Sequence, residues 1–456
     1  MTAMTAGFLA RTMASRGYEV QPGPDVPLVD GVADSRMVTP GVLWAAFRGE
    51  TLDGNDFIED ALARGAAAIV CERPPRIDHP GATVVVAPDS RKALGELAQA
   101  WLAECRPKVV GITGTVGKTT AKELTAATLA ARFAVHRSKE NFNSLEGLPL
   151  SLVALEPGHE VAVLELAMDR PGEIRELCEL VRPDIGVVLN IGLTHASKLG
   201  SIEAIAEEKL SLPRWLDERG TAVLNTDDPR VAAVGPLRCR VLTFGRAIDA
   251  SVRATSVQAR GLAGTDFSVL VDGRELRGHT PVPGEHTLPA ALCGISVALA
   301  CGMDAADAVD ALGDSGYAGR MVQRPGRNGA VLLDDRYNSS PASLEGALRL
   351  LAATPGRRIA LLGAMAELGD AEAAEHCRAG SVAAECCDIL AASGEPARGL
   401  VEAARKAGLQ SARWFQDREE AASWIQGQLR AGDHVLIKAS RSQAFERVIP
   451  LLEAER

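Results

Sequence analysis

A glycine-rich stretch between an apolar segment and a strong helix former constrains this chain more than any other feature. Residues 109–120 read Val-Val-Gly-Ile-Thr-Gly-Thr-Val-Gly-Lys-Thr-Thr, and the helix-favouring run Ala-Lys-Glu-Leu follows. Glycines in such a loop let backbone N–H groups approach phosphate oxygens, and the start of the next helix adds partial positive charge. The order strand, loop, helix therefore predicts a phosphate-binding loop.

The spacing of this loop is a variant of the common pattern. That pattern has a glycine five positions before Gly117, where this chain has Ile112 and places the glycine one step earlier. We expect Lys118 to reach the terminal phosphates and the Thr119 hydroxyl to hold Mg²⁺. A glycine-rich turn without special chemistry is the alternative, which a helix opening directly after a strand disfavours. The predicted nucleotide contacts of the loop are Gly114, Thr115, Val116, Gly117, Lys118, Thr119 and Thr120.

The length of 456 residues predicts about three domains. We expect a mixed α/β domain over residues 1–105, a central domain over 106–315 and a third domain over 316–456. Strands and helices alternate in the central domain, which is typical of a doubly wound, mostly parallel sheet. Its predicted strands cover residues 108–113, 161–166, 185–191, 221–225 and 241–244, and a β-rich insert covers 252–276. The predicted strands of the third domain cover residues 330–334, 358–362, 388–392 and 434–438.

Composition excludes several classes of protein. The net charge of −10 argues against nucleic acid as the main partner. No apolar run approaches the roughly 20 residues that a membrane span needs. The nine cysteines are scattered and show no metal-ligand spacing, as expected of reduced thiols in the cytoplasm. We therefore expect a cytoplasmic protein without stable membrane insertion, and a monomer.

Polar side chains follow the predicted central strands at the edge where ligands bind in such sheets. Glu165 ends an apolar strand, and a carboxylate there is a natural Mg²⁺ ligand; helix capping is the alternative. His195 lies just beyond another strand end, where a metal or phosphate contact and a purely structural role are equally plausible. Lys209 lies on a predicted helix over 202–216, either on a solvated charged face or directed at the metal site.

The third domain repeats this arrangement. Asp335, Tyr337 and Asn338 follow one predicted strand, and Lys438 and Arg441 lie at the end of another. Acidic, amide and basic groups at neighbouring strand ends suggest a second ligand surface that faces the nucleotide.

Together these motifs resemble those of the Mur ligase family of ATP-dependent amide-forming enzymes, in one order over nearly the whole chain. The resemblance is carried by Asp34-Ser35-Arg36, Phe47-Arg48-Gly49, the loop at 113–120, Asn141-Phe142-Asn143, Glu165, His195, Lys209, Gly319-Arg320-Met321, Asp334 to Asn338 and Lys438 to Arg441.

The resemblance implies a central P-loop ATPase domain, an N-terminal domain that binds a UDP-linked substrate and a C-terminal Rossmann-like domain that closes over the nucleotide. It implies ATP and Mg²⁺ as cofactors, and a nucleotide-linked peptide and a dipeptide as small-molecule substrates. A substrate carboxylate would be phosphorylated to an acyl phosphate, which an amine then attacks. A related ligase for another acid and amine, and a non-catalytic nucleotide-binding protein, are the alternatives.

The resemblance also assigns roles to individual residues. It implies catalytic roles for Lys118, His195 and Lys209, with Lys209 carrying CO₂ as a carbamate. The implied metal ligands are Thr119, Glu165, His195 and Lys209. Asn143, Arg320 and Asp335 would join the loop in binding the nucleotide. The implied substrate-binding residues are Ser35, Arg36, Asn338, Lys438 and Arg441.

Overall fold

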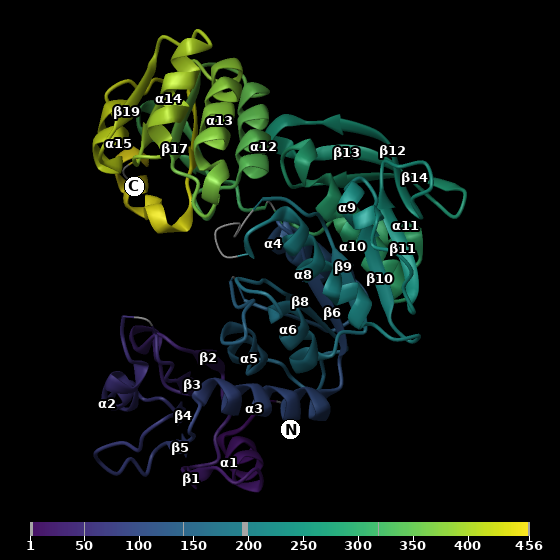
Figure 1. Cartoon of the computed structure of the whole chain (residues 1–456), viewed down its shortest axis with the longest axis vertical. Helices are drawn as coiled ribbons and strands as arrows, with labels where there is room; N and C mark the ends of the chain where they lie inside the picture. The colour runs from purple at the N-terminus through teal and green to yellow at the C-terminus, as the bar shows by residue number, and fades with distance from the viewer. Residues whose placement is uncertain (1–2, 50, 140, 194–198, 318, 455–456) are drawn as a thin grey trace.

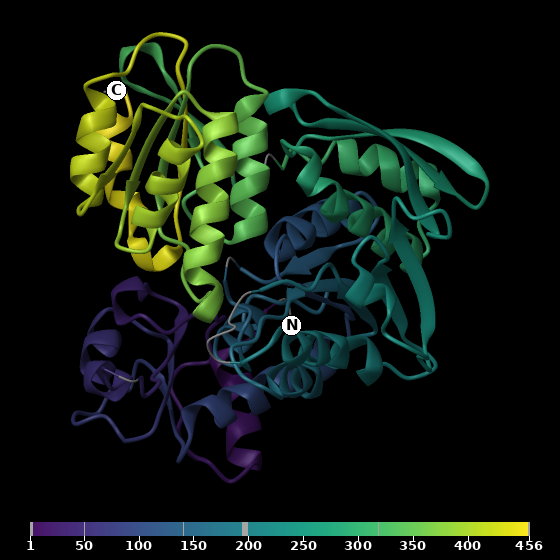
Figure 2. The same ribbon diagram turned by 45° about the horizontal axis from the view of Figure 1, so that its top comes forward.

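The computed structural model forms three α/β lobes, and the first and third lie on the same side of the middle one (Figures 1 and 2). The structure describes residues 3–49, 51–139, 141–193, 199–317 and 319–454. Each lobe contains its own sheet, and all three sheets are mostly parallel. The predicted three-domain α/β fold class is therefore confirmed.

The N-terminal lobe contains a five-stranded sheet in the described part of the chain, with the order β1-β5-β4-β3-β2. Only the pairing of β1 with β5 is antiparallel among these strands. The elements are α1 (Ala6–Ser15), β1 (Glu19–Gln21), β2 (Asp30–Val32), β3 (Val42–Ala45), α2 (Ile58–Ala63), β4 (Ala68–Cys71), β5 (Thr83–Val86) and α3 (Ser90–Cys105).

The middle lobe is built on a nine-stranded sheet, counted over the described residues, with the order β14-β13-β12-β11-β10-β9-β6-β8-β7. In this order, the seven strands from β12 through β6 to β7 are parallel to one another. Strands β13 and β14 continue the sheet as an antiparallel insert. Its strands are β6 (Lys108–Thr113), β7 (Val135–Arg137), β8 (Val161–Glu165), β9 (Ile185–Val188), β10 (Thr221–Asn225), β11 (Arg240–Gly245), β12 (Val252–Ala259), β13 (Thr265–Val271) and β14 (Arg274–Thr280).

Helices cover both faces of the middle sheet, as predicted for a doubly wound fold. One apolar cluster packs α4 and α10 against one face, and another packs α6 and α8 against the other. The helices described in the middle lobe are α4 (Lys118–Ala130), α5 (Gly147–Leu152), α6 (Glu173–Val181), α8 (Ile202–Trp215), α9 (Pro229–Ala232), α10 (Leu288–Ala300) and α11 (Ala305–Gly313).

The C-terminal lobe contains a six-stranded sheet over the residues described, with the order β15-β16-β20-β17-β18-β19, in which β15 alone runs antiparallel. Its strands are β15 (Val322–Pro325), β16 (Val331–Asp334), β17 (Arg358–Gly363), β18 (Ile389–Ser393), β19 (Ala412–Phe415) and β20 (His434–Lys438). Its helices are α12 (Pro341–Ala352), α13 (Glu372–Cys386), α14 (Ala397–Lys406), α15 (Arg418–Gln426) and α16 (Ile449–Leu452).

The N-terminal and middle lobes share one apolar core. Helix α3 contributes Leu97 and Trp101 to a buried cluster that continues through Leu148 of α5 and Leu164 of β8. The indole N–H of Trp101, which is fully buried, donates to the carbonyl of Leu155 at 2.8 Å. These two lobes are therefore joined by close packing as well as by the chain itself.

Candidate functional site

The predicted phosphate-binding loop lies between the end of β6 and the start of α4. Gly117 caps the helix with φ of +84°, a left-handed conformation that glycine adopts without strain. The side chain of Asn190 accepts from the N–H groups of Thr115 and Val116 at 3.0 and 2.8 Å and donates to the Val116 carbonyl. Asn190 thus fixes the shape of the loop, a role that the sequence pattern did not reveal.

Lys118 folds back over the loop. Its ammonium donates to the carbonyls of Gly114 and Thr115 at 2.8 and 3.3 Å. Burial lowers the pKa of Lys118, and the nearby Arg320 adds to this effect, whereas Glu165 opposes it. The first turn of α4 and this lysine place positive groups where phosphate oxygens would bind.

Glu165 and Thr119 meet at the ends of β8 and α4. The Thr119 hydroxyl donates to one carboxylate oxygen of Glu165 at 2.6 Å, and the Asn143 amide donates to the other at 2.8 Å. Arg320, from the segment that leads into the third lobe, also donates to the Thr119 hydroxyl. Glu165 is 3% exposed, so its carboxylate is held at a fixed position inside the protein.

These two side chains fit the chemistry of a magnesium site. Hydroxyl and carboxylate oxygens are hard donors, and Mg²⁺ commonly takes one or two carboxylates and completes its shell with phosphates and water. Within the described residues, no group of three or more His, Cys, Asp or Glu side chains is arranged to hold a metal ion. The protein therefore offers Mg²⁺ a partial set of ligands, which a bound nucleotide would complete.

Lys209 reaches the same loop from α8. It is 2% exposed, and its ammonium donates to the Gly114 carbonyl at 3.0 Å. Burial lowers the pKa of Lys209 well below its usual value, and the neighbouring Lys118 contributes to the decrease. The alternative that Lys209 lies on a solvated charged face is therefore wrong. Its neighbour Glu208 accepts from the N–H groups of Gly172 and Ile174 at the start of α6.

The third lobe faces the loop with a second polar surface. Lys438 is 2% exposed, and it pairs with Asp335 at 2.5 Å and donates to the Asn338 carbonyl at 2.9 Å. The guanidinium of Arg320 stacks on the Tyr337 ring at 3.7 Å, and that of Arg441 lies 5.3 Å from the same ring.

A cavity of about 450 Å³ lies between these two surfaces. Most of the predicted nucleotide and substrate residues line it, which brings together side chains from opposite halves of the sequence. The predicted residues on its wall are Thr115, Val116, Gly117, Lys118, Thr119, Thr120, Asn143, Glu165, Arg320, Asp335, Asn338, Lys438 and Arg441.

Other predicted residues lie elsewhere. Among the described residues, Gly114 and Lys209 lie behind the loop and do not line the cavity. Ser35 is buried in the N-terminal lobe, and Arg36 is exposed there and pairs with Asp34 at 2.6 Å; neither borders the cavity. His195 falls outside the described residues, so its role stays a prediction.

The cavity also has walls that the sequence did not single out. His286 and Thr287 line it, as does the hydroxyl-bearing Ser339. Burial lowers the pKa of His286, so its imidazole is neutral at physiological pH. No local sequence signal marks these residues, because their shared position depends on how the third lobe meets the middle one.

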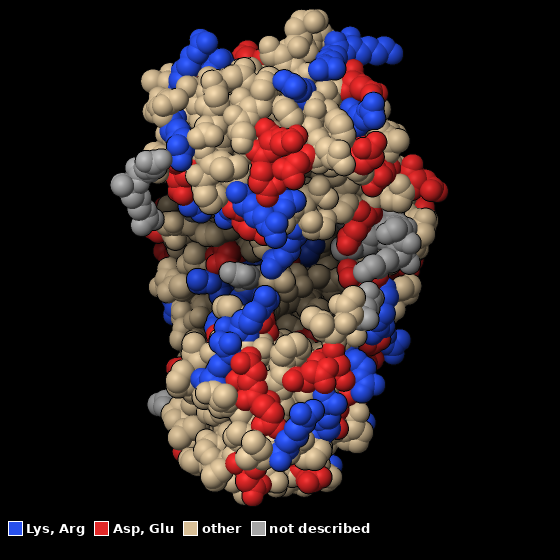
Figure 3. Space-filling model, turned by 90° about the vertical axis from the view of Figure 1, so that its left-hand side faces the viewer, with Lys and Arg blue, Asp and Glu red and all other residues tan. Residues whose placement is uncertain are grey.

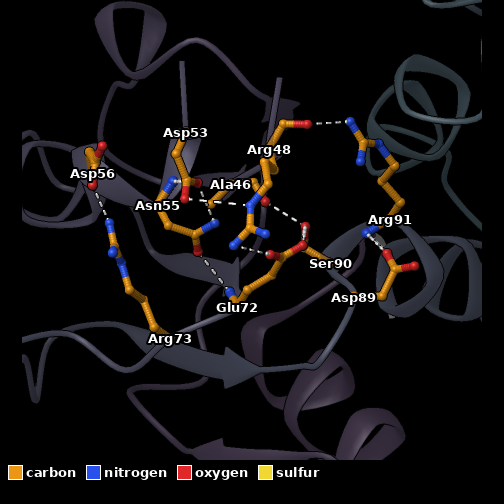
Figure 4. Close-up of polar contacts among 10 residues, drawn as sticks. All are labelled: Ala46, Arg48, Asp53, Asn55, Asp56, Glu72, Arg73, Asp89, Ser90 and Arg91. Carbon is orange, nitrogen blue, oxygen red and sulfur yellow. Dashed lines mark hydrogen bonds and ion pairs between the residues drawn. The ribbon is translucent and has the colours of Figure 1, made fainter. Parts of the chain in front are cut away.

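The N-terminal lobe presents an ordered arginine cluster (Figure 4). Arg48 lies 3.7 Å from both Asp53 and Glu72, and its carbonyl accepts from Arg91 at 2.8 Å. Arg91 also pairs with Glu146 of the middle lobe. Lys and Arg side chains gather around the hollow between the first and third lobes (Figure 3), which suits an anionic ligand.

The chain matches three known domain families in sequence. Residues 32–102 match the Mur ligase family catalytic domain, residues 112–298 the Mur ligase middle domain, and residues 319–441 the Mur ligase glutamate ligase domain.

Full-length relatives show the same similarity. The UDP-N-acetylmuramoyl-tripeptide–D-alanyl-D-alanine ligase of Bacillus subtilis is 31% identical over 442 residues, which cover 95% of both chains. The Synechocystis enzyme of the same name is 34% identical over 444 residues, with 94% of this chain and 93% of the relative covered.

Solved structures agree in fold. MurF from Acinetobacter baumannii superposes with a TM-score of 0.83 at 26% identity and 99% coverage of both chains. MurF ligase from Thermotoga maritima, in complex with ADP, gives a TM-score of 0.77 at 29% identity, with 92% of this chain and 96% of that one covered. Among the described segments, no helix combines the length and apolar character that crossing a membrane requires.

Proposed function

The chain belongs to the Mur ligase family, and on this premise we propose that it is an ATP-dependent ligase that adds D-alanyl-D-alanine to UDP-N-acetylmuramoyl-tripeptide in peptidoglycan synthesis. The similarity to enzymes of that name over almost the full chain supports the choice of substrates. The observation that carries the proposal is the cavity where the phosphate-binding loop faces Asp335, Asn338 and Lys438.

The chemistry follows from the charges that must meet. A carboxylate oxygen of the tripeptide bonds to the γ-phosphorus of ATP, and the bond from that phosphorus to the bridging oxygen breaks to release ADP. The dipeptide amine then attacks the acyl carbon, loses a proton, and phosphate leaves. Because an anion attacks a polyanion, Lys118, Arg320 and the loop N–H groups are needed to neutralise the developing charge.

Thr119 and Glu165 would hold Mg²⁺, which supplies Lewis-acid neutralisation of the phosphate oxygens. We propose that Lys209, whose pKa is lowered by burial, carries a carbamate, and that His195 contributes to a second metal site. The remaining loop residues and Asn143 and Asp335 would bind the nucleotide.

The substrates would be held by the two outer lobes. We propose that Ser35 and Arg36 bind the nucleotide-linked peptide and that Asn338, Lys438 and Arg441 bind the acceptor. We place the domain boundaries after residues 105 and 315. All nine cysteines are free thiols, which supports a cytoplasmic location. A monomeric state stays a prediction.

The test is direct. The purified protein is incubated with ATP, Mg²⁺, D-alanyl-D-alanine and UDP-N-acetylmuramoyl-tripeptide carrying either lysine or diaminopimelate, and products are identified by mass. Formation of a UDP-linked pentapeptide with stoichiometric phosphate supports the proposal. Phosphate release only with another acid and amine would replace these substrates with others, and tight ATP binding without turnover would favour a non-catalytic role.

A further inference from the structure

Lys122 is a buried lysine one turn beyond Lys118 on α4. It is 0% exposed and, among the described residues, does not border the nucleotide cavity. Its ammonium donates to the carbonyl of Ser138, just after β7, and pairs with Glu123 at 2.9 Å. A charge taken out of water is costly even when it is paired and hydrogen-bonded, so this position calls for an explanation.

Ser138 connects Lys122 to the strand that carries the candidate metal ligand. Its hydroxyl accepts from the backbone N–H of Glu165 at 3.1 Å, and its own N–H donates to the Val163 carbonyl at 3.0 Å. The carbonyl of Ser138 is held by Lys122, while its other polar groups are held by β8. The end of β8 is thereby fixed against helix α4.

The contacts form a closed ring that starts and ends on one helix. Lys122 on α4 holds Ser138, Ser138 holds the backbone of Glu165, and the carboxylate of Glu165 accepts from Thr119 in the first turn of α4. The spacing between the Thr119 hydroxyl and the Glu165 carboxylate thus depends on a contact one helical turn away.

A second ion pair reinforces the attachment of β7 to this helix. Glu123 binds Lys122 with one carboxylate oxygen and Arg137, the last residue of β7, with the other, at 2.9 Å in each case. His136 adds no charge to this region at neutral pH, because burial and the surrounding cations lower its pKa to about 3. Lys122 and Arg137 therefore share one carboxylate, and the hydrogen bond to Ser138 satisfies the buried ammonium.

We propose that Lys122 is a positioning residue for the magnesium site, acting through Ser138 to hold the Glu165 carboxylate opposite Thr119. The inference rests on the proposed function, since it takes Thr119 and Glu165 to be metal ligands. It assigns Lys122 no contact with substrate or nucleotide. Outer contacts that orient a metal ligand typically change metal affinity 10- to 100-fold when removed.

The test measures ADP binding to the full-length protein by calorimetry, once with Mg²⁺ and once with EDTA. The dissociation constant in EDTA divided by that in Mg²⁺ reports how strongly the metal assists binding, without reference to turnover. Lys122→Met should lower this ratio about 10- to 100-fold and leave the dissociation constant in EDTA unchanged. The matched control is Lys139→Met, because Lys139 pairs instead with Asp30 of the N-terminal lobe.

The outcomes separate the inference from the proposed function. A wild-type ratio near one would overturn the metal site itself. A large wild-type ratio that Lys122→Met preserves, or equal weakening in Mg²⁺ and in EDTA, would overturn the positioning role alone. If Lys122→Met fails to fold by circular dichroism, Ser138→Ala decides: it removes only the hydroxyl that meets Glu165, and an unchanged ratio there would also reject the inference.

Discussion

Replacing Lys209 with methionine should abolish ligation and yet stabilise the free protein. The lysine is 2% exposed, and its ammonium contacts the Gly114 carbonyl at 3.0 Å. Methionine has a similar length and no charge, so it can fill the same space without desolvating an ammonium group. The variant therefore separates what this lysine contributes to function from what it costs in stability.

The size of the effect follows from two opposing changes. Losing the hydrogen bond to Gly114 costs about 1 kcal/mol, and that carbonyl keeps its bond from Lys118 at 2.8 Å. Replacing buried charged groups with apolar ones of similar volume often stabilises a protein by about 1–4 kcal/mol. We expect a net gain of about 1–3 kcal/mol in the free energy of unfolding at neutral pH, or about 1–2 °C in Tm per kcal/mol for a protein of this size.

The gain should depend on pH with a definite sign. Because burial lowers the pKa of Lys209, the unfolded chain binds more protons than the folded one between the folded pKa and about 10.5. The free energy of unfolding of the wild type therefore rises with pH across that window. The advantage of Lys209→Met is largest at low pH and shrinks as the pH approaches 10.5.

The assay is thermal unfolding of the ligand-free protein in CO₂-free buffers between pH 6 and pH 10, without magnesium. Lys209→Arg is the control. Because arginine stays charged throughout this pH range, this variant should be less stable than Lys209→Met at every pH. A Lys209→Met variant that is less stable than the wild type, or a difference that does not change with pH, would refute the reasoning.

Three further predictions concern the loop, the third lobe and the contact between lobes. Lys118→Ala should abolish phosphate release in the ligation assay and leave the circular dichroism spectrum unchanged; an active variant would contradict the assignment of the loop. Lys438→Met leaves Asp335 without its partner at 2.5 Å and should lower the free energy of unfolding, measured in urea, by about 3 kcal/mol. Adding Asp335→Asn should restore most of this loss, and an unaffected single variant would contradict the pairing. Trp101→Phe leaves the Leu155 carbonyl unpaired and should lower the free energy of unfolding by about 1–3 kcal/mol. Chemical denaturation can measure this loss against the half-buried control Trp424→Phe, and equal effects would argue against this contact.

Local sequence patterns predicted the elements that such patterns determine. Strands β6, β10 and β20 have the predicted bounds, because each is a mostly apolar run that contains β-branched residues and lies between polar ends. The three-residue strands β1, β2 and β7 were not predicted, since so short a segment carries no period and forms only by pairing with a neighbour.

The candidate site divides in the same way. The loop could be predicted because its glycines, lysine and threonine are adjacent in sequence. The support from Asn190 and Lys209 could not be derived from spacing, because these residues lie 75 and 95 positions from their partners in the loop. Asn225 and Asp228, at the end of β10, hold the backbone at Leu189 and Ile191, which spacing could not predict either.

The apolar core that passes from α3 into α5 and β8 determines how the chain can be divided. Cutting between residues 105 and 106 would expose Trp101 and Leu148 to water, so a fragment ending there should aggregate. The apolar core clusters of the third lobe instead consist almost entirely of residues after 320. A protease acting on the intact enzyme should therefore yield two stable pieces rather than three, with the larger one keeping the first two lobes together.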